Sequence, residues 1–112
     1  MTDVPQRETA KICSVKDLHT GTYVIQEGWQ PNYVLSHGRK LSRVNIMGIV
    51  VSKPTTNEFS LDDGSGTISI TDFNQSPKVA RLEIGEPVMV IGRPRQNNNT
   101  IFIACEIVNK SS

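Results

Sequence analysis

Residues 61–73 have the apolar and polar pattern of two short strands joined by a tight turn rich in aspartate and glycine. Because successive side chains of a strand point to opposite faces, Ile68 and Ile70 in the second strand share an apolar face. The opposite face is small and polar and ends in an aromatic ring, and it carries Thr67, Ser69, Thr71 and Phe73. Such a face is a candidate platform on which a flat ligand stacks.

The strongest strand pattern covers residues 43–53, which are rich in β-branched side chains, and we expect Pro54 to end the strand. Val44 and Ile46 share one face, but beyond Gly48 apolar residues occupy both faces. This change predicts a bend or bulge at Gly48, which is how a strand turns the corner of a small closed barrel.

Three segments supply the remaining strands. Residues 58–61 extend the first hairpin strand, residues 88–95 form a strand that we expect to fray or become edge-like at Pro94, and residues 100–108 form the closing strand. Phe102 falls on the outward side of the closing strand. The residues predicted to point inward are Phe59, Leu61, Val88, Val90, Ile101, Ile103, Cys105 and Ile107.

Shorter elements connect and precede these strands. Residues 77–82 are expected to form a short helix with Pro77 in its first turn. Residues 11–18 have apolar positions at helical spacing and form either a short helix or the lead into a strand. Residues 22–26 are predicted as a strand, and residues 33–35 as extended chain.

Five core strands, with a short helix between the third and fourth and an N-terminal extension, predict an all-β fold, namely a five-stranded Greek-key barrel of the OB type. An immunoglobulin sandwich needs about seven strands. An SH3-like barrel is the runner-up, but it has no place for the helical insert. With 112 residues the chain has the size of one domain, and we expect a flexible tail over residues 1–9 and a single domain over residues 10–110.

Composition and local signals exclude several classes. The longest uninterrupted apolar run, residues 46–51, is far shorter than the roughly 20 residues of a membrane-spanning helix. Residues 1–8 lack the apolar core and basic lead of a secretion signal. We therefore expect a cytoplasmic protein without a membrane partner. Cys13 and Cys105 are predicted to be reduced structural residues, because they form no CxxC pair and have no histidine at metal-ligand spacing.

The net charge of +1 is unevenly distributed, with only bases charged in residues 39–53 and only acids in residues 54–77. This pattern fits either solvated loops or a phosphate-facing patch. Asp62 and Asp63 are neighbours whose side chains point apart at a strand end, so we expect Asp63 to cap the turn rather than take part in catalysis. The two histidines have no nucleophile at a useful spacing. We expect no enzyme activity, no metal and no cofactor.

Residues 42–51, 61–68 and 88–93, in this order and spacing, resemble the OB domain of the middle subunit of replication protein A. Residues 27–33 make the chain more similar still to the archaeal replication protein A-associated OB proteins. The resemblance covers residues 10–108. It implies binding to single-stranded DNA in a complex with other replication protein A-like subunits, roles in DNA replication and repair, and a nucleoid-associated location if the chain is archaeal.

The resemblance also implies where bases stack. Phe73 takes the place of the family's stacking aromatic near the end of the third strand, and Ser69 and Thr71 share its face as candidate nucleic-acid contacts. The chain departs from the family pattern at the predicted hairpin tip, residues 96–99. Many single-strand binders carry a second stacking aromatic there, whereas this chain has Gln-Asn-Asn-Asn.

Four basic residues are the predicted phosphate contacts. Arg93 on the fourth strand occupies the position that the resemblance assigns to a phosphate-binding residue, with Arg95 close by. Lys53 and Arg43 lie at plausible positions on the long first strand.

The remaining aromatic residues allow two interpretations. Trp29 and Tyr33 are candidates for a second stacking site, whereas large aromatics of this kind more often pack against the barrel. Phe102 is a candidate for lining a groove or for contacting another subunit. Two functions therefore compete: direct binding to single-stranded DNA with little sequence preference, with RNA as an open alternative, and a structural subunit that mainly contacts protein.

Overall fold

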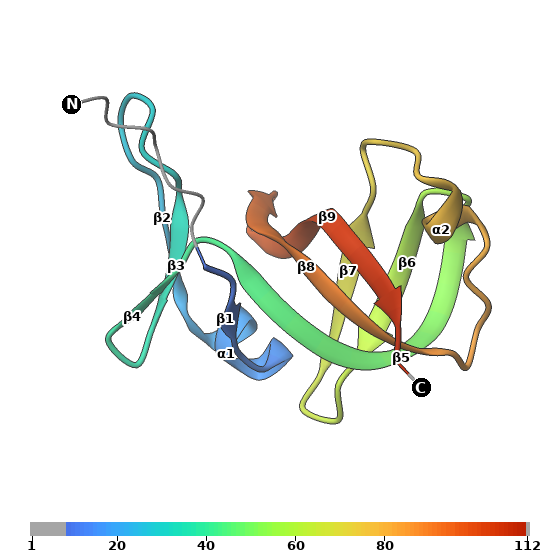
Figure 1. Cartoon of the computed structure of the whole chain (residues 1–112). Coiled ribbons are helices and arrows are strands. Elements are labelled where there is room, and N and C mark those ends of the chain that lie inside the picture. The colour runs from blue at the N-terminus through green and yellow to red at the C-terminus, as the bar shows by residue number, and fades with distance from the viewer. Residues whose placement is uncertain (1–8, 112) are drawn as a thin grey trace.

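The computed structural model describes residues 9–111 and contains a closed barrel of five strands. The barrel strands are β5 (Val44–Thr55), β6 (Glu58–Asp62), β7 (Thr67–Thr71), β8 (Pro87–Asn97) and β9 (Thr100–Lys110). They follow the order β5-β6-β7-β9-β8, and β8 pairs back onto β5. Only β7 and β9 are parallel among these pairs. With the short helix α2 (Pro77–Ala80) between β7 and β8, this arrangement confirms the predicted OB barrel (Figure 1).

Alternate residues of each strand fill the barrel interior, as the sequence pattern predicts. One inward prediction is wrong, because Ile107 is only partly buried and Val108 takes the inward place with 5% exposure. The β9 strand has one extra residue, Glu106, opposite the step from Ile91 to Gly92. This bulge reverses the alternation after it. The inward predictions that are confirmed are Phe59, Leu61, Ile68, Ile70, Val88, Val90, Ile101, Ile103 and Cys105.

The corner predicted at Gly48 agrees with the point at which β5 changes its pairing partner, although the irregularities in its ladder with β6 come only after Val50. Strand β5 pairs with β8 as far as Ile49 and with β6 from Ile49 onward. A Cβ atom at position 48 would lie 2.5 Å from the carbonyl oxygen of Asp62, so the two strands approach closely only because residue 48 is glycine. The expected end at Pro54 is wrong. The strand continues to Thr55 through an irregular part of its ladder with β6, where a residue without an N–H is tolerated.

Strand β8 becomes an edge near Pro94, as expected, but it does not fray there. Pro94 is buried opposite Ile103, and β8 continues to Asn97. Beyond Gly92, β8 pairs with β9 alone. A proline therefore fits on this part of the strand, which has one unpaired edge.

The N-terminal extension contributes to the barrel core. The two expectations for residues 11–18 both hold in part, because β1 (Lys11–Ile12) pairs in parallel with β5 and α1 (Val15–Thr20) follows it. Val15 and Leu18 are fully buried within the same cluster as the barrel residues. The helix is thus part of the packing of the barrel.

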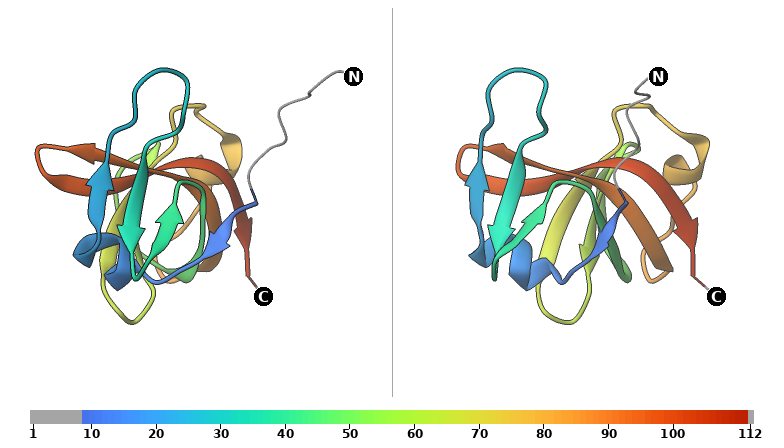
Figure 2. Two further views of the ribbon diagram at one scale, coloured as in Figure 1. Left: turned by 90° about the vertical axis from the view of Figure 1, so that its left-hand side faces the viewer. Right: turned by 60° about the vertical axis from the view of Figure 1, so that its left-hand side comes forward.

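Three strands of the extension form a separate antiparallel sheet beside the barrel (Figure 2). They are β2 (Thr22–Val24), β3 (Tyr33–Ser36) and β4 (Arg39–Leu41). The predicted strand and extended segment correspond to β2 and β3, whereas β4 was not predicted. The tail expected over residues 1–9 lies, apart from the exposed Thr9, outside the described residues. Within the described chain, no helix has the length and apolar character needed to cross a membrane.

Candidate nucleic-acid interface

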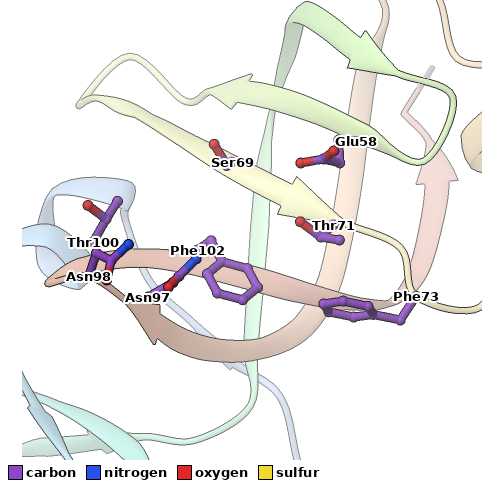
Figure 3. Close-up of a pocket in the computed structure, with 8 residues that line it drawn as sticks. All are labelled: Glu58, Ser69, Thr71, Phe73, Asn97, Asn98, Thr100 and Phe102. Atoms are coloured by element: carbon purple, nitrogen blue, oxygen red, sulfur yellow. The ribbon is translucent and has the colours of Figure 1, made fainter.

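Phe73 and Phe102 lie beside each other on the outer face of the barrel (Figure 3). Phe73 follows β7 and is 68% exposed, and its ring centroid lies 6.5 Å from that of Phe102 on β9, with the ring planes at 61°. The two rings meet because β7 and β9 are parallel neighbours, with Thr71 opposite Ala104. This edge-to-face geometry is favourable for the pair and leaves the Phe73 ring largely open to solvent.

The aromatic pair forms part of an open groove with a volume of about 590 Å³. Its walls are the outer face of β7, the hairpin between β8 and β9, and the start of β6 (Figure 3). The lining residues are Glu58, Ser69, Thr71, Phe73, Asn97, Asn98, Thr100 and Phe102. Hydroxyl and amide groups thus surround two aromatic rings. Among these lining residues there is no lysine or arginine, and Glu58 is the only ionisable one.

Asp72 fixes the segment that carries Phe73. Asp72 is 4% exposed, and its carboxylate accepts the backbone N–H groups of Asn74 at 3.0 Å and Ser76 at 2.7 Å. Its own N–H donates to the carbonyl of Asn57 at 2.8 Å. The backbone on both sides of Phe73 is therefore held in place, so the exposed ring has a defined position.

Arg95 is the predicted basic residue that the structure places next to the aromatic pair. It pairs with Phe102 across the β8–β9 hairpin, so the two side chains share the outer face. Arg93 lies two residues earlier on the same face. Its Nε is 3.6 Å from Oε2 of Glu106, and its Nη1 donates to the carbonyl of Ser42 at 3.3 Å.

Arg43 and Lys53, two of the predicted phosphate contacts, have partners within the protein. The Arg43 side chain is 8% exposed and its Nε donates to Oε1 of Glu106 at 2.7 Å. The Lys53 ammonium donates to the carbonyls of Val79 and Ala80, both at 3.0 Å, at the end of α2. The Arg43 guanidinium is therefore paired with a carboxylate in a buried position, and the Lys53 ammonium caps the C-terminus of α2.

A second open pocket, of about 530 Å³, lies at the N-terminal extension. Trp29 on its rim is 91% exposed, so the expectation that Trp29 packs against the barrel is wrong. Tyr33 lines the same pocket, and the Lys40 ammonium lies 5.3 Å from the centroid of the Tyr33 ring. The two predicted aromatic candidates are therefore close together, but apart from the Phe73 groove.

Sequence reasoning did not assign several groove residues. The sequence makes Phe102 a candidate for lining a groove, but its contact with Phe73 depends on a parallel strand pair that is distant in sequence. The sequence places Asn97 and Asn98 only at the hairpin tip, where Asn98 has φ of 51°, a left-handed conformation that asparagine tolerates. The polar character of the tip was the available signal for a wall of a hydrogen-bonding groove.

The other titratable groups have structural roles. Asp63 caps the turn as predicted, because its carboxylate accepts the N–H and hydroxyl of Ser65 and also the N–H of Val15 at the start of α1. Burial alone raises the pKa of Asp63, but these hydrogen bonds together lower it below its ordinary value. Burial raises the pKa of the free thiols Cys13 and Cys105 to about 11 and about 12. In the described part of the chain, no cluster of three His, Cys, Asp or Glu side chains is arranged to hold a metal.

Comparison with known proteins gives a likeness of structure only. No protein-family model and no curated protein matches the chain. A chain of a replication protein A heterotrimer bound to ssDNA superposes with a TM-score of 0.72 at 16% identity, over 94% of this chain and 83% of that one. A chain of the S. pombe Stn1-Ten1 complex gives 0.75 at 13% identity, over 93% and 79%. Yeast RPA bound to ssDNA gives 0.67 at 23% identity, over 95% and 79%. At these identities the likeness is one of fold, and it agrees with the strand order in showing an OB barrel.

Proposed function

We propose that the chain binds single-stranded nucleic acid, DNA in the first place, by stacking bases on the Phe73–Phe102 pair. The observation that carries this proposal is an exposed phenylalanine beside a second ring in an open groove of small polar residues. Stacking a base on an aromatic side chain contributes about 1–3 kcal/mol and does not select one base. The hydroxyl and amide groups around the rings add hydrogen bonds to base edges. Binding is therefore expected to show little sequence preference.

Phosphate contacts lie beside this groove rather than inside it. Arg95 shares the outer face with Phe102 and is partly exposed. One or two such cations give a shallow dependence of affinity on salt, because the slope follows the number of phosphates neutralised. We expect weak binding by the isolated chain, and membership of a replication protein A-like assembly would supply further contacts. The structural likeness to chains of a replication protein A heterotrimer and of the Stn1-Ten1 complex supports such an assembly.

A titration with a labelled oligothymidylate of about 12 nucleotides tests the proposal, since OB domains cover about 4–16 nucleotides. Phe73→Ala is expected to lower the affinity about 5- to 150-fold, which corresponds to about 1–3 kcal/mol of stacking. Met47→Ala is the matched control, because Met47 is apolar and 64% exposed but lines neither pocket. An oligouridylate of the same length, titrated in parallel, decides between DNA and RNA. Equal affinities of the wild-type protein and Phe73→Ala would refute stacking on Phe73, and no binding at low salt would refute direct binding.

A second candidate function is assembly with another protein subunit. Met47, Ile49 and Val51 point outward from β5 with exposed fractions of 64%, 41% and 41%. An apolar row of this kind on a sheet face is typical of a surface that another protein covers. Affinity purification of the tagged protein from its own cells separates the two functions. If Met47→Asp loses a stable protein partner that Phe73→Ala retains, assembly is favoured. If Phe73→Ala loses captured nucleic acid that Met47→Asp retains, nucleic-acid binding is favoured.

A further inference from the structure

Trp29 is presented to solvent on a loop that has its own hydrogen bonds. The backbone N–H of Gln26 donates to Oδ1 of Asn32 at 2.8 Å, and the Gln26 side chain donates to the carbonyl of Pro31 at 2.9 Å. Asn32 also donates to the Tyr23 hydroxyl at 3.3 Å. These bonds join the two sides of the loop around an indole that is 91% exposed. The hydrogen bonds brace the loop that carries Trp29, and the exposed indole leaves its ring available for stacking by a base.

The charges around Trp29 match a strand of phosphates. Lys11 and Lys40 line the pocket, and the Lys11 ammonium donates to the carbonyl of Lys40 at 3.0 Å. The Lys40 ammonium lies over the Tyr33 ring. No carboxylate is present among the described residues that line this pocket, whereas the Phe73 groove contains a carboxylate and no cation. Aromatic faces beside ammonium groups are what single-stranded nucleic acid requires.

Residues of β8 link the linings of the two pockets. From Phe102, the β8–β9 hairpin leads across to Arg95 and then to Arg93 on the same face. The Arg93 guanidinium reaches the carbonyl of Ser42, which lines the Trp29 pocket. Strand β8 also contacts β3, which carries Tyr33. Figure 1 shows the end of the β8–β9 hairpin directed towards the side of the barrel on which the three-stranded sheet lies.

We propose that Trp29 and Tyr33, with Lys11 and Lys40, form a second stacking subsite for the same single strand. This proposal rests on the proposed function of the Phe73 groove. The strand leaves that groove across Arg95 and Arg93, and a base beyond the crossing stacks on Trp29 while its phosphates lie beside the lysines. Because the two subsites act on one strand, a long strand gains from the high effective concentration of its second segment. A strand too short to reach both subsites does not.

The test uses the full chain and two probes, unlabelled and labelled oligothymidylates of about 4 and about 12 nucleotides. Trp29 is the only tryptophan in the sequence, so its emission reports this subsite alone. The long strand is expected to quench Trp29 emission. Trp29→Ala is expected to reduce the affinity for the long strand about 5- to 150-fold and to remove most of its advantage over the short one. Ile25→Ala is the matched control, because Ile25 is 74% exposed in the same hairpin but does not line the pocket.

Three outcomes would overturn the proposal. In the first, the long strand binds in a Phe73-dependent way, but Trp29 emission does not change and Trp29→Ala binds with wild-type affinity. This outcome refutes the second subsite and leaves the proposed function standing. The second outcome is quenching of Trp29 in the wild-type protein and loss of affinity in Trp29→Ala, while Phe73→Ala binds normally. It refutes the path from the Phe73 groove together with the proposed function. Absence of binding by either strand, measured by anisotropy of the label, refutes both. Unchanged thermal unfolding of each variant confirms that these effects are not due to loss of the fold.

Discussion

Removal of the Asp72 carboxylate is the most informative perturbation of the Phe73 groove, because it leaves both rings in the chain. Asp72 is 4% exposed, and its carboxylate accepts the backbone N–H groups of Asn74 and Ser76, which follow Phe73. Asp72→Ala deletes both hydrogen bonds. Asp72→Asn keeps one oxygen acceptor but turns an amide N–H towards the other donor, so it deletes one bond and adds a repulsive contact.

The magnitudes follow from these two bonds. A hydrogen bond to a charged group contributes about 1.5–3 kcal/mol, and the value here is at the low end because Asn74 is exposed and water can replace the acceptor. Asp72→Ala is therefore expected to lower the free energy of unfolding by about 2–3 kcal/mol. Reordering one backbone residue upon binding costs about 1–2 kcal/mol, so the affinity for oligothymidylate is expected to fall about 5- to 30-fold.

Urea denaturation measures the loss of stability, and oligothymidylate titration measures the loss of affinity. Hydrogen exchange of the Asn74 and Ser76 amides reports the loss of the two hydrogen bonds. Asp62→Ala is the control, since its carboxylate accepts a single N–H, from Gly64, in a turn that lines neither pocket. This control is expected to cost no more than about 1 kcal/mol of stability and to bind normally. The positional role of Asp72 is refuted if Asp72→Ala loses stability and amide protection but binds oligothymidylate with wild-type affinity.

Two further predictions concern the barrel itself. Asp63→Asn is expected to be less stable than the wild-type protein at neutral pH. The folded-state pKa of Asp63 lies below its ordinary value of 3.8. The difference in unfolding free energy is therefore constant well above pH 3.8 and disappears as the pH falls through the lowered pKa. Urea denaturation at a series of pH values measures this difference. A difference in unfolding free energy that persists below the lowered pKa contradicts a role for the charge of Asp63. Gly48→Ala is expected to lower the unfolding free energy by about 2 kcal/mol or more, because the new Cβ clashes with the carbonyl of Asp62. If Gly48→Ala has the same thermal unfolding midpoint as the wild-type protein, β5 and β6 can move apart at little cost in free energy.

The strands and their inward faces could be predicted from sequence because period-two alternation is a local property. Phe59, Leu61, Ile68 and Ile70 are buried on that basis alone. The prediction is wrong after Glu106, where one extra residue reverses the alternation. Nothing in the composition of that segment distinguishes a bulge from a regular strand.

The site was less predictable because its geometry depends on residues distant in sequence. Phe73 was identified from its face, but its neighbour Phe102 was not paired with it. The structural partners of Arg43 and Lys53 come from β9 and α2, and a basic residue on a strand has the same local pattern whether it contacts solvent or an internal anion. The exposure of Trp29 likewise depends on how the loop projects from the barrel.

The parallel pairing of β7 with β9 also has a consequence for the order of events during folding. The hairpin of β6 and β7 can form from neighbouring residues, whereas β9 must cross from the end of the chain to lie beside β7. Phe73 and Phe102 therefore remain apart until the last strand docks. The ability to bind nucleic acid should then return during refolding only when the barrel closes. An earlier intermediate should contain the β6–β7 hairpin but should not bind nucleic acid.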